Sequence, residues 1–140
     1  MAGSATVYTE RGVLGHTLAI APLTVPATVY LGLCAATPVP TRSTGGTEVE
    51  AGGYVRVAVS FALAGNPDNV AVNSAPVEFP AATAAWDTIG WFEVWDAETL
   101  GNRLYWGPLV EADGVTPVTR DVEENDIVRF LVGVLRIEAT

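Results

Sequence analysis

The side chains that could carry nucleophilic chemistry are few in this chain. His16 is the only histidine and Cys34 the only cysteine, so a Ser-His-Asp or Cys-His arrangement would have to use one of them. His16 falls in the segment with the weakest secondary-structure pattern. Cys34 falls in the apolar run 30–35, where a lone cysteine is usually a small buried hydrophobe. A Gly-Xaa-Ser-Xaa-Gly elbow is also missing, so we expect a protein without enzymatic activity.

Metal and cofactor chemistry also lacks the residue patterns it needs. Zinc requires several His or Cys ligands, and the chain has one of each. Sixteen acidic residues could always supply a pair for sugar hydrolysis, but their spacing identifies none. The glycine pairs 45–46 and 52–53 have no lysine to complete a phosphate loop. One acidic cluster lacks the glycine of a calcium loop and is expected in a solvated turn: Asp121, Glu123, Glu124 and Asp126. We expect no cofactor and no metal.

The charge balance limits the classes of partner. Seven arginines, no lysine and sixteen acids give a net charge of −9, and a nucleic-acid binder needs a basic stripe. Anionic membrane surfaces are disfavoured for the same reason, and no apolar run approaches the ~20 residues of a membrane helix. The apolar fraction is nevertheless 49%, which favours surface that is covered by other copies or by another protein.

Four tryptophans lie close together in the second half of the chain, at positions 86, 91, 95 and 106. Trp91 and Trp95 share a strand face with Glu93, which favours an interface that anchors a protein or stacks on a sugar. Aromatic packing inside a β-sandwich is the alternative, and Trp86 fits it better. Both interpretations of Trp91 and Trp95 remain open from the sequence.

The first 22 residues differ from the rest. Val7, Leu14 and Leu18 recur at helical spacing within residues 5–18, and Ser4 or Thr6 can serve as N-cap. Gly12 and Gly15 each weaken a helix by about 1 kcal/mol relative to alanine. We therefore predict a short helix or extended arm in residues 1–22, followed by one domain over residues 23–140.

The remainder reads as strands separated by turns. A long loop rich in Pro, Thr, Ser and Gly covers residues 36–53, and one helical turn is possible at residues 81–87. About eight strands are predicted: 27–35, 54–63, 70–72, 77–79, 89–95, 103–109, 118–122 and 126–137. The layout predicts an all-β fold, a single-domain β-sandwich or jelly roll.

Several segments, in this order, resemble a family of small tailed-bacteriophage virion proteins labelled as tail-fibre or capsid-decoration proteins. They are Pro-Ala-Thr-Val-Tyr-Leu-Gly-Leu at 26–33, Gly-Thr-Glu-Val at 46–49, Gly-Gly-Tyr-Val-Arg at 52–56, Phe-Pro-Ala-Ala-Thr-Ala-Ala-Trp at 79–86 and Tyr-Trp-Gly-Pro-Leu at 105–109. The resemblance runs from near Thr9 to the last strand. It implies a virion component with a β-sandwich fold and no enzymatic activity.

The function expected from these observations is that of a capsid decoration (cement) protein. It would bind the outer surface of a phage head, contact the major capsid protein and itself as a homodimer or homotrimer, and be made in the bacterial cytoplasm. The alternative is a tail-fibre or baseplate component that contributes to host attachment. Partner contacts are expected from the arm, the loop and the tryptophan face: Val7, Tyr8, Leu14, Leu18, Thr47, Glu48, Trp91 and Trp95.

Overall fold

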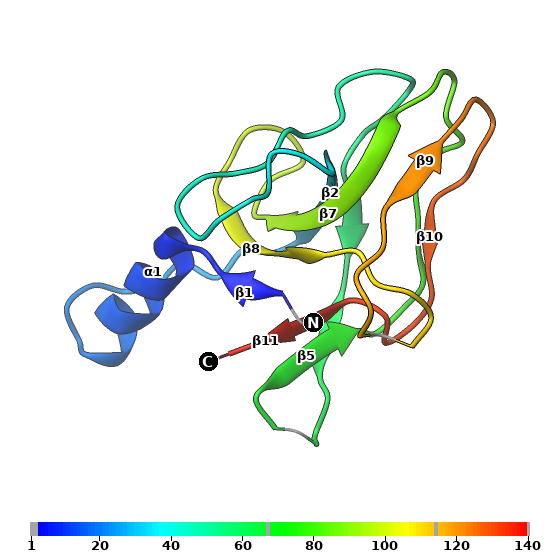
Figure 1. The fold of residues 1–140 in the computed structure, drawn as a ribbon. Helices are drawn as coiled ribbons and strands as arrows, with labels where there is room; N and C mark the ends of the chain where they lie inside the picture. Colours follow the sequence, from blue (N-terminus) through cyan, green and yellow to red (C-terminus); the bar gives the residue numbers. More distant parts are fainter. Residues whose placement is uncertain (1–2, 67, 114, 140) are drawn as a thin grey trace.

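The protein is a mostly β structure with one short helix, and all its paired strands run antiparallel. The computed structural model describes residues 3–66, 68–113 and 115–139 (Figure 1). The prediction of a β fold preceded by a short helix or extended arm is confirmed, with a helix as the outcome. None of the helical residues described here forms a helix long and apolar enough to cross a membrane.

Within the described residues the strands form three sheets. The largest has the order β1-β8-β7-β2-β3, with β9 paired to β7. Its strands are β1 (Ser4–Ala5), β2 (Val29–Ala35), β3 (Val57–Val59), β7 (Asp87–Trp95), β8 (Arg103–Pro108) and β9 (Arg120–Val122). A three-stranded sheet has the order β11-β5-β4, from β4 (Phe61–Leu63), β5 (Val70–Asn73) and β11 (Arg136–Glu138). The third sheet pairs β6 (Val77–Glu78) with β10 (Arg129–Phe130).

The centre of the large sheet is where the sequence pattern is most regular. In β2, Leu31 lies opposite Val94 and Leu33 opposite Phe92 of β7, and all four side chains are buried. Strands β7 and β8 form a hairpin whose turn is held by Asp96, because its carboxylate accepts hydrogen bonds from the main-chain and side-chain nitrogens of Asn102. The strands predicted at 27–35, 89–95 and 103–109 are therefore confirmed.

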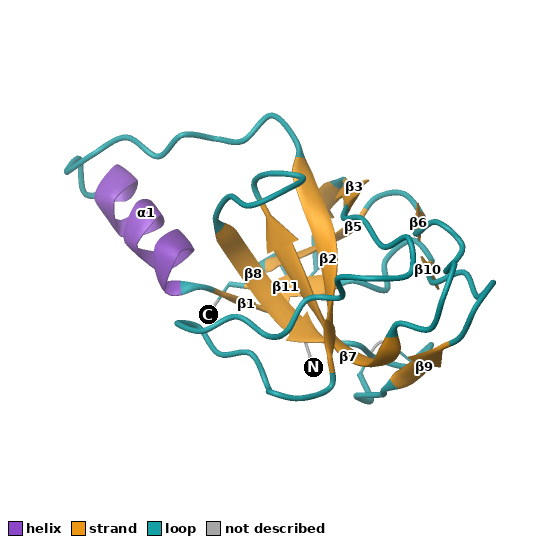
Figure 2. Cartoon of the chain, turned by 90° about the horizontal axis from the view of Figure 1, so that it is seen from above, coloured by secondary structure: helices purple, strands orange, loops and turns teal. Residues whose placement is uncertain are grey.

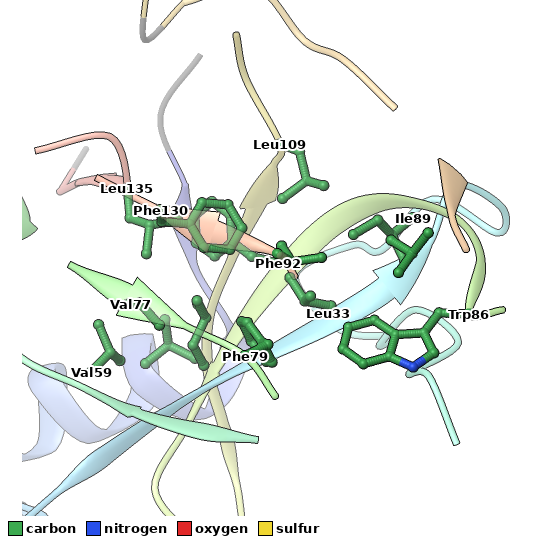
Figure 3. Packing of buried hydrophobic residues seen from close by; sticks show 14 of the residues in the cluster. Leu33, Val59, Val77, Phe79, Trp86, Ile89, Phe92, Leu109, Phe130 and Leu135 are labelled. Atoms are coloured by element: carbon green, nitrogen blue, oxygen red, sulfur yellow. The ribbon is translucent and has the colours of Figure 1, made fainter. Parts of the chain in front are cut away.

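One aromatic cluster fills the space between the large sheet and the smaller ones. The ring of Phe79 packs against Tyr54, Trp86 and Phe130, with centroid separations of 6.0–6.4 Å. Figure 3 shows Phe79, Trp86 and Phe130 together with Leu33, Phe92 and Ile89 of the large sheet. Such edge-on and offset contacts add to the burial of apolar area. Trp86 is 3% exposed, so its prediction as a core residue is confirmed.

The strand predicted over residues 54–63 is wrong as a single element. Val57–Val59 is β3 of the large sheet, whereas Phe61–Leu63 is β4 of the three-stranded sheet. The chain thus changes sheets at Ser60, although the alternation of apolar residues continues. Val55 and Leu63, which belong to the alternating apolar residues of this predicted strand, are exposed.

The strand predicted over residues 126–137 is also interrupted. Only Arg129–Phe130 (β10) and Arg136–Glu138 (β11) are strand, and a turn at Gly133, whose φ is +82°, separates them. Leu131 and Val132 are exposed on this turn. The helical turn expected at residues 81–87 is absent, because residues 81–86 form an irregular segment and Asp87 begins β7. Of the strand expected at 118–122, only Arg120–Val122 is β9.

The helix α1 (Val7–Thr17) begins where the N-cap pattern predicts. Thr6 is its N-cap, and its Oγ1 accepts a hydrogen bond from the Thr9 N–H. Ser4, the other candidate cap, lies in β1 opposite Trp106. Figures 1 and 2 show α1 beside the large sheet, next to β1 and β8, with its C-terminal end directed away from the sheets. The boundary between arm and domain at residue 22 remains a prediction.

Candidate functional site

A buried carboxylate lies under the long loop, on the face of the large sheet opposite the aromatic cluster. Glu93 of β7 is 1% exposed and forms an ion pair of 3.2 Å with Arg103 of β8. The Glu93 carboxylate also accepts hydrogen bonds from the Gly46 N–H and from the Cys34 thiol, each at 3.1 Å. The loop therefore covers this face, and Glu93 fastens it to the sheet. Glu93 is thus enclosed on this face rather than exposed. The interface interpretation of Trp91 and Trp95 remains a prediction.

Cys34 has no nucleophilic character in this setting. Its side chain is fully buried, and burial together with the negative charge of Glu93 raises the pKa of the thiol far above its ordinary value. The expectation of a small buried residue at position 34 is confirmed. The thiol donates to Glu93 and so belongs to the structure of the loop.

A second carboxylate fastens the loop at its other end. Glu48 accepts a hydrogen bond of 2.6 Å from the Tyr54 hydroxyl and a bidentate pair, both bonds 2.9 Å, from the Arg56 guanidinium. Arg56 also donates to the carbonyl oxygens of Ala97 and Leu100 and lies 3.8 Å above the Trp95 ring. Burial, with Glu48 as the second cause, raises the pKa of Tyr54.

The loop also extends the sheet through its main chain. The Ala35 N–H donates to the Thr47 carbonyl at 2.8 Å, and the Val49 N–H donates to the Leu33 carbonyl at 3.0 Å. Thr47 and Glu48 therefore lie beside the second half of β2, in line with β3. Both residues make contacts inside the chain, and their expected role in partner binding remains a prediction.

Three tryptophans lie outside the core, and the start of the same loop contacts one of them, Trp91. The Trp91 indole N–H donates to the Ala36 carbonyl at 3.1 Å, and its ring packs against Trp106 at a centroid distance of 6.0 Å. Trp91, Trp95 and Trp106 are each half-buried. Trp91 and Trp95 thus form the border of the covered polar centre rather than an open platform.

The helix α1 is anchored to the body through its N-terminal half. The Thr6 hydroxyl lies 2.6 Å from the Arg103 carbonyl and 3.0 Å from the Leu104 carbonyl, and the buried Thr9 hydroxyl donates to Leu104 at 2.7 Å. Glu10 forms an ion pair with Arg42 of the long loop. These contacts fix the start of α1 on β8 and leave its second half to project.

The helix α1 and the segment that returns from it form a small hairpin. Residues 7–24 are called the arm from here on, and its second half projects from the body. A Cβ at Gly12 would lie 2.7 Å from Leu23 Cδ1, so the missing side chain admits Leu23 against the helix. The Leu23 N–H donates to His16 Nδ1 at 3.2 Å. His16 therefore serves the arm's shape. Gly12 permits this close return, a role that its cost to the helix alone does not indicate.

The arm carries a cluster of exposed apolar side chains. Leu18 is 64% exposed and Ile20 is 75% exposed, and Tyr8, Val13 and Leu14 are also exposed. Val7, at the start of the helix, is half-buried. The structure thus brings together the four arm residues expected in partner binding, Val7, Tyr8, Leu14 and Leu18. It separates them from Trp91, which contacts Ala36 of the loop, and from Trp95, which lies beneath Arg56.

A groove of about 800 Å³ runs between α1 and the edge of the large sheet. Val13 and Leu14 line one wall, and Tyr105 and Trp106 of β8 line the other. Glu138 of β11 contributes a carboxylate, and the indole N–H of Trp106 is buried without a hydrogen-bond partner among the described residues. No cluster of three or more metal-ligating side chains is found in the part of the chain that the structure describes. This groove is called the arm groove. The arm and the arm groove together are the candidate site for binding another protein.

Comparison with known proteins agrees with a virion role. A family model described as podophage GP4 fiber I protein gp80 matches residues 4–138. The matched range contains every element from β1 to β11, including the arm and the arm groove. No curated protein matches the chain.

Proposed function

The chain belongs to the podophage GP4 fiber I protein family of phage virion structural proteins, and on this basis we propose that it is a tail-fibre component that contributes to host attachment. The observation that carries the proposal is the match over residues 4–138, since it covers the whole domain and its description names a fibre protein. That description supports the tail-fibre alternative better than the capsid cement function that we expected first. The outer capsid surface is accordingly not the proposed location.

The proposed component acts by binding and not by catalysis. Two observations support this: His16 Nδ1 is occupied by the Leu23 N–H, and Cys34 is enclosed beside Glu93 as a neutral thiol. The buried carboxylate of Glu93 and the half-buried carboxylate of Glu48 are each compensated by an arginine. Such paired groups hold a loop in place, whereas a general acid or base needs access to a substrate.

We further propose that the domain is built as a β-sandwich. The cluster of buried apolar residues takes Leu31 and Phe92 from the large sheet, Phe130 from the β6–β10 pair and Ile137 from the β4–β5–β11 sheet. A core shared in this way between facing sheets is the defining feature of sandwich folds. A rigid domain of this kind suits a part that carries mechanical load between a particle and a cell.

Contacts with other virion proteins are assigned to the arm and the arm groove. The loop of residues 36–53 is held by Glu48 and Glu93, so its polar groups are largely satisfied inside the chain. The arm instead exposes Leu18 and Ile20, which lose contact with water only when a partner covers them. The partner is expected to be a protein, since the net charge of −9 disfavours nucleic acid and anionic membranes.

Localisation on intact particles tests the proposal. Gold-labelled antibodies against this chain are expected to decorate tails, and particles lacking the protein are expected to adsorb poorly to host cells while retaining their DNA on heating. Label confined to heads, together with heat-induced loss of DNA from particles that lack the protein, would replace the fibre function by the cement function. Particles from a phage that lacks the gene, with the protein supplied in trans during assembly, serve as the control for assembly defects.

A further inference from the structure

We propose that the arm groove binds the arm of a second copy of this chain. In this contact, Leu18 and Ile20 of one copy pack between the two walls of the groove in its neighbour. Because the arm and the groove adjoin each other in one molecule, two copies related by a two-fold axis can exchange arms reciprocally. The proposal concerns the purified chain, so it holds or fails independently of where the protein sits on the particle.

The first argument is the distribution of exposed apolar surface. Among the described residues, six of the fourteen large apolar side chains that are exposed lie between residues 8 and 25: Tyr8, Val13, Leu14, Leu18, Ile20 and Val25. The rest are spread over the remainder of the chain, in loops and, for Leu63, in β4. A concentration of this kind on a projecting element marks an interaction site on a soluble protein.

The second argument is electrostatic and points to a second copy. Residues 1–25 contain one acid, Glu10, and one arginine, Arg11, so this part of the chain is electrically neutral. The remaining residues, 26–140, carry the whole net charge of −9. Two copies that met through their bodies would therefore repel each other, whereas a neutral arm can approach the acidic body of its neighbour without this penalty.

The third argument is a charge complement between the arm and the groove. Arg11 is exposed on the arm, and Glu138 lines the groove; no ion pair of either residue is found among the described residues. Leu18, the C-cap residue of α1, follows Arg11 by seven residues, which is close to two helical turns, so the two side chains lie on the same side of the arm. An arm whose Leu18 enters the groove thus brings its Arg11 along the same face toward the neighbour's carboxylate.

A chain cannot fill its own groove with its arm tip. The helix α1 is itself one wall of the groove, through Val13 and Leu14. The contacts of Leu23 with Gly12 and His16 keep the returning segment on the helix. Figure 2 shows the end of α1 directed away from the sheets, so the occupant must come from another molecule.

The main test is the mass of the full chain in solution. Light scattering and sedimentation velocity are expected to give an oligomer at micromolar concentration. The variant Leu18→Glu/Ile20→Glu is expected to be monomeric, with its dissociation constant raised at least a hundredfold. The matched control is Leu131→Glu/Val132→Glu, which adds the same charge to another exposed apolar pair on the turn between β10 and β11 and should keep the wild-type mass. Circular dichroism and the melting temperature verify that each variant folds.

A charge exchange tests the orientation of the contact. Arg11→Glu and Glu138→Arg are each expected to weaken self-association several-fold at low salt, because each places like charges together. The double variant is expected to regain the wild-type affinity. A monomeric wild-type chain would overturn the proposal. So would a Leu18→Glu/Ile20→Glu variant that keeps the oligomeric mass. A double variant weaker than both single variants would equally overturn the arm-in-groove orientation.

Discussion

Glu93 and Arg103 form an ion pair of 3.2 Å beneath the loop of residues 36–53, with side chains that are 1% and 9% exposed. They come from adjacent strands of one hairpin, β7 and β8. The carboxylate also accepts hydrogen bonds from the Gly46 N–H of the loop and from the Cys34 thiol of β2. One buried acid therefore joins three parts of the chain, and the cost of burying its charge is offset by an opposite charge and two hydrogen bonds.

The first prediction follows from this network. Glu93→Ala leaves Arg103 buried without its carboxylate and should lower the free energy of unfolding by about 3–5 kcal/mol. The matched control is Glu78→Ala, since Glu78 pairs with Arg129 at 3.9 Å on the surface and should cost less than about 1 kcal/mol. Urea denaturation monitored by tryptophan fluorescence measures both. Equal losses for the two variants would contradict the structural role of Glu93.

The second prediction concerns alkaline pH. Burial raises the pKa values of Cys34 and Tyr54 in the folded chain, so the unfolded chain releases these protons first. Stability from these groups is complete below the unfolded pKa values of about 8.5 and 10, and it falls as pH rises above them. The free energy of unfolding should therefore decline from about pH 8.5 upward. In Cys34→Ala the decline should begin about 1.5 pH units later, and an unchanged onset would refute the assignment.

The centre of the large sheet could be predicted from the sequence because the side chains of its strands alternate between the two faces of the sheet. Leu31 and Leu33 alternate with Gly32 and Cys34, and the partner strand β7 repeats the pattern. Burial there is set by local side-chain direction, which has a period of two. The helix start was equally predictable, since the cap at Thr6 depends on neighbouring residues only.

The two failed strands show where alternation stops being informative. The valines continue through residues 54–63, but the chain leaves β3 and enters β4 in another sheet at Ser60. Nothing local specifies that change, because it depends on which distant strand pairs with each half. In residues 126–137 a signal was present, since Gly133 inside an apolar run is a turn residue.

The candidate site was predictable only in part. Leu14 and Leu18 at helical spacing pointed to the arm, and in the structure both are exposed, with Leu14 lining the groove. The burial of Glu93 was not predictable, because an acid on a strand face normally meets water. Its partner Arg103 becomes visible only when the hairpin pairing and the loop that covers it are known.

The third prediction tests the backbone beside the aromatic cluster. Gly52 has a φ of +68°, and a Cβ there would lie 2.5 Å from the Ala84 carbonyl and 2.7 Å from the Trp86 ring. Its carbonyl also accepts the Trp86 indole N–H at 2.8 Å. Gly52→Ala should therefore destabilise the fold by roughly 3 kcal/mol or more, by combining backbone strain with a clash against the core.

Gly133→Ala is the control for backbone strain alone. Its φ is +82°, but a Cβ there would meet nothing within 4 Å. This variant should lose only about 1–2 kcal/mol. Thermal melts of both proteins give the comparison, and a loss at Gly52 no greater than that at Gly133 would rule out the clash.

The last prediction concerns the anchor of the arm. The Thr6 hydroxyl caps α1 and also contacts the main chain of β8, so Thr6→Ala removes both contacts at once. The expected loss is about 1–2 kcal/mol, confined to the arm, because the core makes no use of this side chain. Hydrogen exchange of the amides in residues 7–17 should accelerate about 5–30-fold, while the amides of β2 and β7 keep their rates. Thr17→Ala, which removes only an exposed bond to the Val13 carbonyl, is the control and should leave the exchange of the first helical turn unchanged. If exchange also accelerates for the amides of β2 and β7, the arm unfolds together with the core. That result would contradict an arm that opens independently of the sheets.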